Sequence, residues 1–159
     1  MRLHSHLAVV AAGVLALATL GVPQAGLAAE AGSRKAIDQA AAVNTELALA
    51  YMREGNLKAA REKIDKALQQ DARTANTQMA AGFVYDKLGD KKKALSHFEQ
   101  AVKLGGKDNP DVVANAAVYF CMNGEPKRGE QYMLQAAASP LNARPDVAYT
   151  NAGRCARGD

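Results

Sequence analysis

The hydrophobic positions of this chain follow a pattern that occurs three times between about residues 41 and 143. In each copy, small apolar residues are followed one helical turn later by an aromatic residue and then by a glycine. A spacing of three to four residues places side chains on one face of a helix, and glycine accepts the left-handed conformation that ends many helices. Each copy therefore predicts a helix, a tight turn and a second helix. The turn glycines are Gly55, Gly89 and Gly124, separated by 34 and then 35 residues.

Four further columns of residues keep the same phase, which makes the repeat far more specific than one column would. Asn56 and Asp90 follow the turn as N-cap residues of second helices, and Pro126 suits a first helical turn. Pro110 and Pro145 open first helices in the same way. The columns are aromatic (Tyr51, Tyr85, Phe120), small (Ala60, Ala94, Gly129), bulky apolar (Ile64, Phe98, Met133) and again small (Ala67, Ala101, Ala136).

This period and pattern are those of tetratricopeptide repeats (TPR), in which helical hairpins stack because none buries its apolar face alone. We predict an all-α TPR solenoid with three repeats and a partial fourth that acts as a C-terminal cap. The last segment carries Ala152-Gly153 at the small-pair position, and the chain stops before a partner helix. The predicted segments are a signal peptide (1–29), a lead-in (30–40), the three repeats (41–74, 75–109 and 110–144) and the first helix of a fourth (145–159).

The composition supports the all-α prediction and argues against a nucleic-acid partner. The chain is 48% hydrophobic but only 5% aromatic, and its many alanines have the highest helix propensity. Its net charge is +4, yet acidic and basic residues alternate, and the one basic run, Lys91 to Lys93, is typical of a solvated helix face. A nucleic-acid site needs a basic stripe with stacking aromatics or a known module, and the sequence has neither.

The first 29 residues have the order of a secretory signal peptide. Arg2 precedes an uncharged run from Leu7 to Leu20, and small residues follow up to the expected cleavage site after Ala28 or Ala29. A membrane-spanning helix needs about 20 apolar residues, so this run is short for an anchor, although an uncleaved anchor is the alternative. We therefore expect a periplasmic protein. No cysteine lies near the cleavage site to accept a lipid.

The two cysteines, Cys121 and Cys155, lie in the first helices of successive repeats. An even number of cysteines in an exported protein favours a disulfide, which here would clamp the last helix onto the array. The alternative is a pair of small buried thiols.

The sequence contains no combination of residues typical of catalysis. Beyond the predicted signal peptide the only histidine is His97, which we expect to be a surface imidazole rather than a general base. Neither cysteine has a histidine nearby in sequence to activate it, and one histidine with two cysteines lacks metal-ligand spacing. We expect no enzymatic activity, no metal, no cofactor and no small-molecule substrate.

The remaining candidate is the concave face that the first helices of a TPR array form. An apolar stripe with asparagine and basic residues at its rim is suited to a peptide, and methionine suits adaptable surfaces. The alternative for each apolar residue is packing between adjacent helices. The predicted partner-binding residues are Leu49, Met52, Arg53, Asn76, Met79, Phe83, Lys87, Val118 and Met122, with Thr45 and Ala114 also placed on this face.

The second half of the chain resembles the type IV pilus biogenesis/stability TPR family (PilF/PilW). The resemblance runs from about residue 40 to the C-terminus. It rests on Phe120-Cys121 before the turn glycine, Gln135-Ala136, Ser139 to Leu141, Pro145 to Ala148, and Asn151 to Ala156.

The resemblance implies a pilotin-like protein that sits at the outer membrane and helps a secretin assemble into its multimeric pore. The paired cysteines of the family match Cys121 and Cys155, which supports the disulfide. Family members are typically lipoproteins with further repeats, whereas this sequence has no lipobox cysteine and ends inside its fourth repeat. We therefore predict a monomeric periplasmic adaptor for type IV pilus biogenesis whose partner is the secretin. A general periplasmic TPR scaffold in envelope or cell-wall assembly is the alternative.

Overall fold

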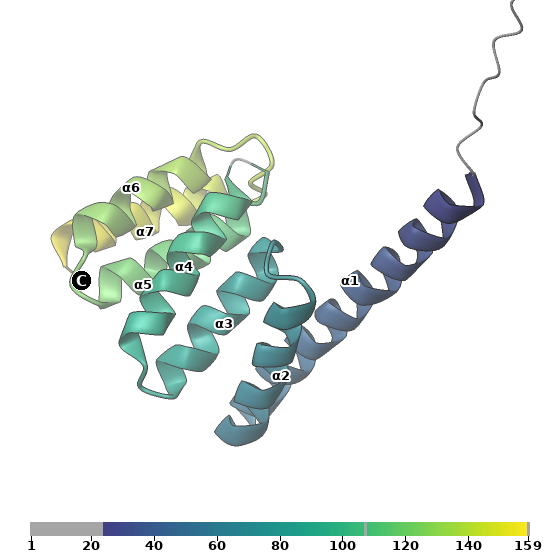
Figure 1. Cartoon of the computed structure of the whole chain (residues 1–159). Coiled ribbons are helices and arrows are strands. Elements are labelled where there is room, and N and C mark those ends of the chain that lie inside the picture. Colours follow the sequence, from purple (N-terminus) through teal and green to yellow (C-terminus); the bar gives the residue numbers. More distant parts are fainter. Residues whose placement is uncertain (1–23, 107, 159) are drawn as a thin grey trace, which may run out of the picture.

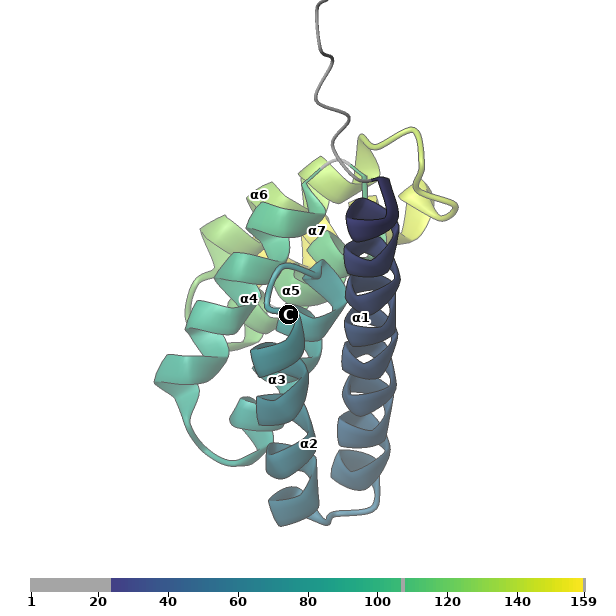
Figure 2. The same ribbon diagram turned by 45° about the vertical axis from the view of Figure 1, so that its right-hand side comes forward.

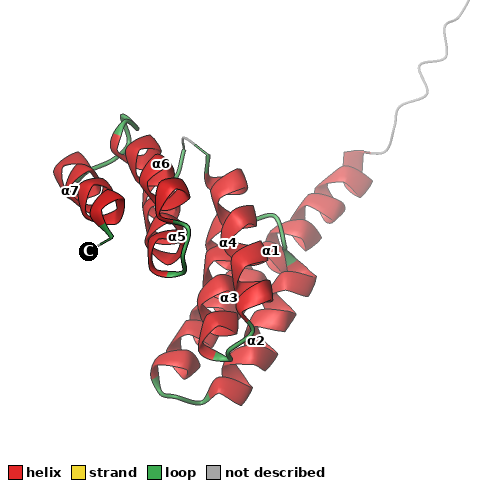
Figure 3. Cartoon of the chain, turned by 90° about the vertical axis from the view of Figure 1, so that its left-hand side faces the viewer, coloured by secondary structure: helices red, strands yellow, loops and turns green. Residues whose placement is uncertain are grey.

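A computed structural model describes residues 24–106 and 108–158, which form seven α-helices and no strand (Figures 1 and 3). This confirms the predicted all-α TPR solenoid. Short loops join the helices into hairpins that stack side by side. The helices are α1 (Gln24–Arg53), α2 (Leu57–Gln70), α3 (Ala75–Lys87), α4 (Lys91–Gly105), α5 (Pro110–Met122), α6 (Pro126–Ala137) and α7 (Pro145–Arg157).

The turn inside each hairpin follows the residue chemistry expected from the sequence. The glycines Gly55, Gly89 and Gly124 have φ angles of +79°, +80° and +88°, a region that favours residues without a Cβ atom. The side chains of Asn56 and Asp90 then accept hydrogen bonds from the amides of Ala59 and Lys93. These N-caps satisfy backbone donors that the first turn of a helix leaves without a partner.

The core of each hairpin is built by the columns that the sequence predicts. The bulky apolar column, Ile64, Phe98 and Met133, is 0%, 0% and 1% exposed. Gly82 lies so close to the Phe98 ring that a Cβ atom at position 82 would come within 2.8 Å of the ring. The small residues of the pattern therefore let the partner helix approach closely enough to bury these bulky side chains.

Aromatic contacts join the second repeat to the third. The rings of Phe98 on α4 and Tyr119 on α5 stack with centroids 4.2 Å apart. On the outer side, Nη1 of Arg128 lies 2.9 Å from a carboxylate oxygen of Glu99, and its guanidinium lies 4.3 Å from the Phe120 centroid. Such a stacked, ion-paired arginine fixes the orientation of two elements better than an isolated surface pair.

A network of polar contacts connects the first two repeats. Tyr85 on α3 donates a hydrogen bond to the Asp65 carboxylate on α2, and burial together with this bond raises the pKa of Tyr85 to about 12. His97 on α4 stacks on the Tyr85 ring and donates from Nδ1 to the side-chain oxygen of Gln78 at 2.7 Å. His97 is therefore half-buried rather than the surface imidazole that the sequence suggested, because α3 supplies it with two partners.

The array curves with its first helices on the inside. Cα atoms of α1 and α3, of α3 and α5, and of α5 and α7 approach within 8 Å. Within the described residues, α2 and α4 do not approach this closely, nor do α4 and α6. Since the first helices lie closer together than the second helices, the first helices line the inner curve, as the sequence predicts.

The first helix, α1, is 30 residues long and extends well beyond the helix that pairs with it (Figures 1 and 2). Residues 30–39, within the predicted lead-in (30–40), are exposed along this extension. Most of the predicted signal peptide (1–29) and its apolar run lie outside the described residues. Among the helices that the structure describes, none is both long and apolar enough to cross a membrane.

Candidate partner-binding surface

Three hollows lie along the inner face, one between each pair of neighbouring first helices. Their cavity volumes are about 350 Å³ between α1 and α3, 230 Å³ between α3 and α5, and 310 Å³ between α5 and α7. Hollows of this size accept individual side chains of a polypeptide laid across the helices. Their linings include Leu49, Asn76 and Met79 in the first, Phe83, Asn115 and Val118 in the second, and Val118, Met122 and Arg154 in the third.

The predicted apolar stripe divides into two parts. Leu49, Met52, Met79 and Phe83 are half-buried and pack against the main core. Leu49 and Met79 also line the first hollow and Phe83 lines the second, whereas Met52 lines none of the three. Val118 and Met122 on α5 are 39% and 79% exposed. The most accessible apolar surface therefore lies on the third repeat, where the helix spacing leaves both side chains uncovered. The rim residues Arg53, Asn76 and Lys87 are exposed.

Two other residues placed on this face by the sequence pattern are less accessible. Thr45 is buried, which corrects the expectation that it is exposed. Its hydroxyl contacts the Ala41 carbonyl at 2.9 Å and the Thr77 hydroxyl at 3.1 Å, so it serves the junction between α1 and α3. Ala114 is half-buried beside the second, smaller core cluster around Met133.

The hollows also contain polar residues that the repeat register did not indicate. Asp86 and Asn115 line the middle hollow, and Asn151 and Arg154 line the third. Asn115 was missed because the matching position in the preceding repeat is the buried Ala80. Asn115, Val118 and Met122 are three and four residues apart and so share one helix face. This local spacing would have identified Asn115 as a residue of the hollow.

The charge of the middle hollow is partly neutralised within the protein. The ammonium of Lys91 lies 2.6 Å from the Asp86 carboxylate, and the hydrogen bond to Asp86 raises the pKa of Lys91. Burial, and then the charge of Asp86, raise the pKa of Tyr119 beside it, so the phenol is neutral at physiological pH. The hollow therefore offers apolar walls, two amides and one already paired carboxylate.

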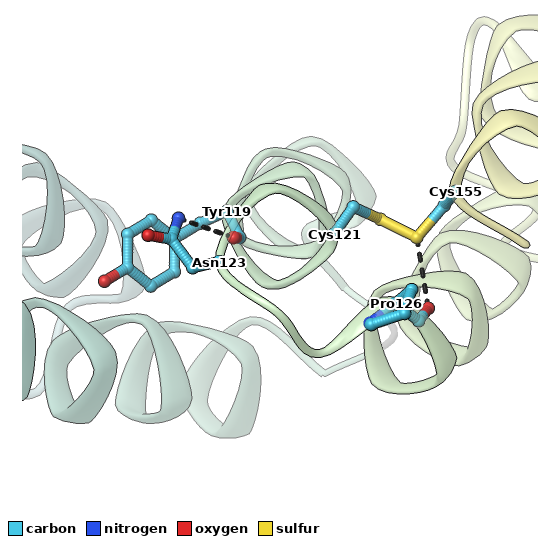
Figure 4. The surroundings of a disulfide bond; sticks show 5 residues. All are labelled: Tyr119, Cys121, Asn123, Pro126 and Cys155. Carbon is cyan, nitrogen blue, oxygen red and sulfur yellow. Dashed lines mark hydrogen bonds between the residues drawn. A yellow bond between two sulfur atoms is a disulfide. The ribbon is translucent and has the colours of Figure 1, made fainter. Parts of the chain in front are cut away.

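The disulfide predicted from the sequence forms between Cys121 on α5 and Cys155 on α7 (Figure 4). The Cα atoms of the two residues are 5.5 Å apart, within the range that a disulfide spans without moving the backbone. The Cys155 sulfur also contacts the Pro126 carbonyl oxygen at 3.1 Å, which places it against the start of α6. Both cysteines line the third hollow, so the bond holds one wall of the inner face in place.

No reactive centre accompanies these hollows in the part of the chain that the structure describes. No three metal-ligating side chains gather there. His97 faces α3, and burial followed by the charge of Lys93 lowers its pKa. The inner face is equipped for binding by shape, apolar contact and amide hydrogen bonds.

The stacked hairpins, their turn glycines and their inner line of hollows define a tetratricopeptide-repeat solenoid. A family model of the tetratricopeptide repeat matches residues 39–105. Over 117 residues the chain is 30% identical to an uncharacterized protein of Haemophilus influenzae, a match that covers 74% of this chain and 65% of that protein.

Two solved structures share the same arrangement. The structure of PilW, described as a widely conserved type IV pilus biogenesis factor, matches with 27% identity and a TM-score of 0.66, over 74% of this chain and 54% of that one. PilF of Pseudomonas aeruginosa matches with 21% identity and a TM-score of 0.66, over 77% of this chain and 56% of that one. The chain thus spans less than two thirds of each relative. The PilW match confirms the resemblance to type IV pilus TPR proteins, and the PilF match shows the shared fold.

Proposed function

We propose that this chain is a periplasmic adaptor for type IV pilus biogenesis, which binds the outer-membrane secretin and assists its assembly. The similarity to PilW, at 27% identity and a TM-score of 0.66, is the observation that supports this most. The inner face supports the same proposal, because its hollows and the exposed Met122 suit a protein segment rather than a reacting small molecule. The adaptor acts by binding and carries out no reaction of its own.

The proposed location follows from the sequence of the N-terminus. An apolar run after Arg2 would direct export, and association with the outer membrane would then occur through the secretin. An oxidising periplasm is also where a disulfide such as Cys121–Cys155 persists.

Site-specific photocrosslinking in the native envelope tests the proposed function. A photoreactive residue at Met122, which is 79% exposed on the inner face, is expected to capture the secretin. The same residue at Gln100, exposed on α4, is the control and should not capture it. Capture of another envelope protein at Met122, together with normal twitching in a deletion strain, would overturn the pilus assignment in favour of a general scaffold.

A further inference from the structure

The inner face carries a regular row of residues where each first helix ends. The row follows the repeat period, with successive members 34, 35 and 35 residues apart: Arg53, Lys87, Met122 and Arg157. Arg53 and Lys87 are exposed, and Arg154 adds a further cation one turn before Arg157. The corresponding row near the start of α3, α5 and α7, and level with it in α1, is Ala42, Asn76, Asp111 and Asp146, which contains no cation. The cations that precede α3 and α7, Arg73 and Arg144, are paired with Asp71 and Asp146. Among the described residues, the cations of the inner face that form no ion pair therefore lie along the edge where the first helices end.

The second helices begin at the same edge and add to its positive charge. Their first turns contain Lys58 in α2, Lys91 to Lys93 in α4, and Lys127 with Arg128 in α6, and none of these turns contains an acidic residue. We call this region the basic turn edge: residues 53–58, 87–93 and 122–128 together with the last turn of α7.

Interaction with the helix dipole explains the cations at the ends of the first helices but not those at the starts of the second helices. A cation in the last turn of a helix is favourable, so Arg53 and Lys87 stabilise the ends of α1 and α3. A cation in the first turn is unfavourable for the same reason. Lys91, Lys93 and Arg128 have internal carboxylate partners. Lys58, Lys92 and Lys127 lie against the local helix dipole without an ion pair among the described residues, and an external anionic group would account for their position.

Internal ion pairs neutralise part of the edge. Asp86 pairs with Lys91, Asp90 with Lys93, and Glu125 with Arg128. Among the described residues, no ion pair is formed by Arg53, Lys58, Lys87, Lys92, Lys127 or Arg154, and Glu54 is the acidic residue of the edge that is likewise without one. A substantial positive charge is left facing solvent at the end of the inner face where Met122 lines the second and third hollows.

We propose that the inner face binds a polypeptide segment with apolar side chains on one side and acidic side chains along the adjacent side. The apolar side chains enter the hollows around Phe83, Val118 and Met122, and the acidic ones face the basic turn edge. A protein segment fits both features, because Met122, an apolar residue 79% exposed, occupies the third place of the otherwise basic row. The proposal rests on the adaptor function but does not depend on which protein carries the segment.

Selection from a phage-displayed library of random peptides tests this proposal with the intact exported chain. We expect the enriched peptides to combine Leu, Met or Phe with Asp or Glu at a regular spacing. The double variant Arg53→Glu/Lys87→Glu should bind a synthetic copy of the best peptide about tenfold more weakly at low salt, and the difference should shrink at high salt. The conservative pair Arg53→Lys/Lys87→Arg should retain binding.

The matched control is Lys66→Glu/Lys103→Glu, which makes the same change of net charge on exposed residues of α2 and α4. It should leave peptide affinity unchanged. Equal weakening by the control, enrichment of peptides without acidic residues, or no enrichment at all would each overturn the proposal. Charge-dependent binding to vesicles of phosphatidylglycerol and phosphatidylethanolamine, in place of peptide enrichment, would mean that the edge contacts a membrane instead. Because the library contains no secretin, failure here is distinct from failure of the pilus assignment, which the envelope crosslinking decides.

Discussion

Gly129 occupies a repeat position at which the first two repeats carry Ala60 and Ala94. A Cβ atom at Gly129 would lie 2.3 Å from the Cys121 sulfur and 2.8 Å from the Ala117 carbonyl oxygen. Two of the near atoms belong to the backbone of α5, which cannot rotate away as a side chain does. The exchange of alanine for glycine in the third repeat is therefore explained by the close approach of the α5 backbone together with the Cys121 sulfur.

Gly129→Ala is expected to lower the free energy of unfolding by about 1–3 kcal/mol, since it overpacks the junction of α5 and α6. Gly153→Ala is the matched control, because its nearest neighbour is the end of the Arg157 side chain at 3.7 Å. That control should stabilise the protein by about 0.5–1 kcal/mol, as alanine does in a helix interior. Urea denaturation of both variants measures the difference, and equal effects would contradict the packing argument.

His97 gives the stability of the protein a dependence on pH. Burial, followed by the nearby charge of Lys93, lowers its pKa from the ordinary value of 6.5, so the unfolded chain binds a proton more readily than the folded one. The free energy of unfolding is then highest above about pH 6.5 and falls as the pH drops through the folded-state pKa.

NMR titration of the histidine resonances should show the His97 signal shifting at lower pH than a model imidazole. His97→Gln should remove part of the loss of stability between about pH 7 and 5. A His97 signal that titrates at or above the model value would contradict the burial and charge argument.

At the scale of elements, α7 depends on two supports. Ala148, Ala152 and Cys155 pack against α6, and the disulfide joins α7 to α5 across a sequence separation of 34 residues. In the chain-entropy account, cross-linking a loop of this length contributes roughly 3–4 kcal/mol by restricting the unfolded chain. The disulfide therefore adds stability to a terminal helix that buries only a limited apolar area.

The double variant Cys121→Ser/Cys155→Ser is expected to lose amide hydrogen-exchange protection in α7 before any loss in α1 to α4. Local opening without global unfolding is typical of terminal elements with few buried contacts. Hydrogen exchange measured by mass spectrometry on peptides from α3 and α7 provides the comparison. Unchanged protection of α7 would show that its packing on α6 suffices without the covalent link.

At the scale of the whole molecule, the proposed binding function depends on an inner face that no single repeat forms. Each hollow takes its lining from two neighbouring first helices, so the face exists only when the hairpins stack. The third repeat contributes the largest exposed apolar surface through Val118 and Met122.

Met122→Asp should abolish capture of the partner while leaving the thermal midpoint within about 1–2 °C of the parent, because a side chain 79% exposed contributes little to stability. Leu141→Asp, in the loop before α7 and 62% exposed, makes the same kind of change away from the inner face and should preserve capture. Co-purification from envelope extracts and thermal unfolding, measured side by side, provide the test. Retention of capture by Met122→Asp would place the binding site elsewhere, and loss of capture in both variants would contradict a site confined to the inner face.

The fold could be predicted because the repeated residues act locally. Gly55 and its equivalents end helices through the backbone freedom of glycine, Asn56 and Asp90 begin helices through their own side-chain bonds, and Ile64 with its equivalents fills one hairpin each. These interactions lie within a few residues or within one hairpin, and they recur with the repeat. For the same reason the sequence alone indicated that the first helices form one continuous face.

Only the tertiary structure decided how accessible each residue of that face is. Thr45 is buried by its contact with Thr77, and Asn115 is exposed although its counterpart Ala80 is covered. The spacing between neighbouring hairpins determines both outcomes, and that spacing results from many contacts between residues distant in sequence. The repeat register assigns equivalent residues to equivalent places, but it contains no information on how far apart successive hairpins stand.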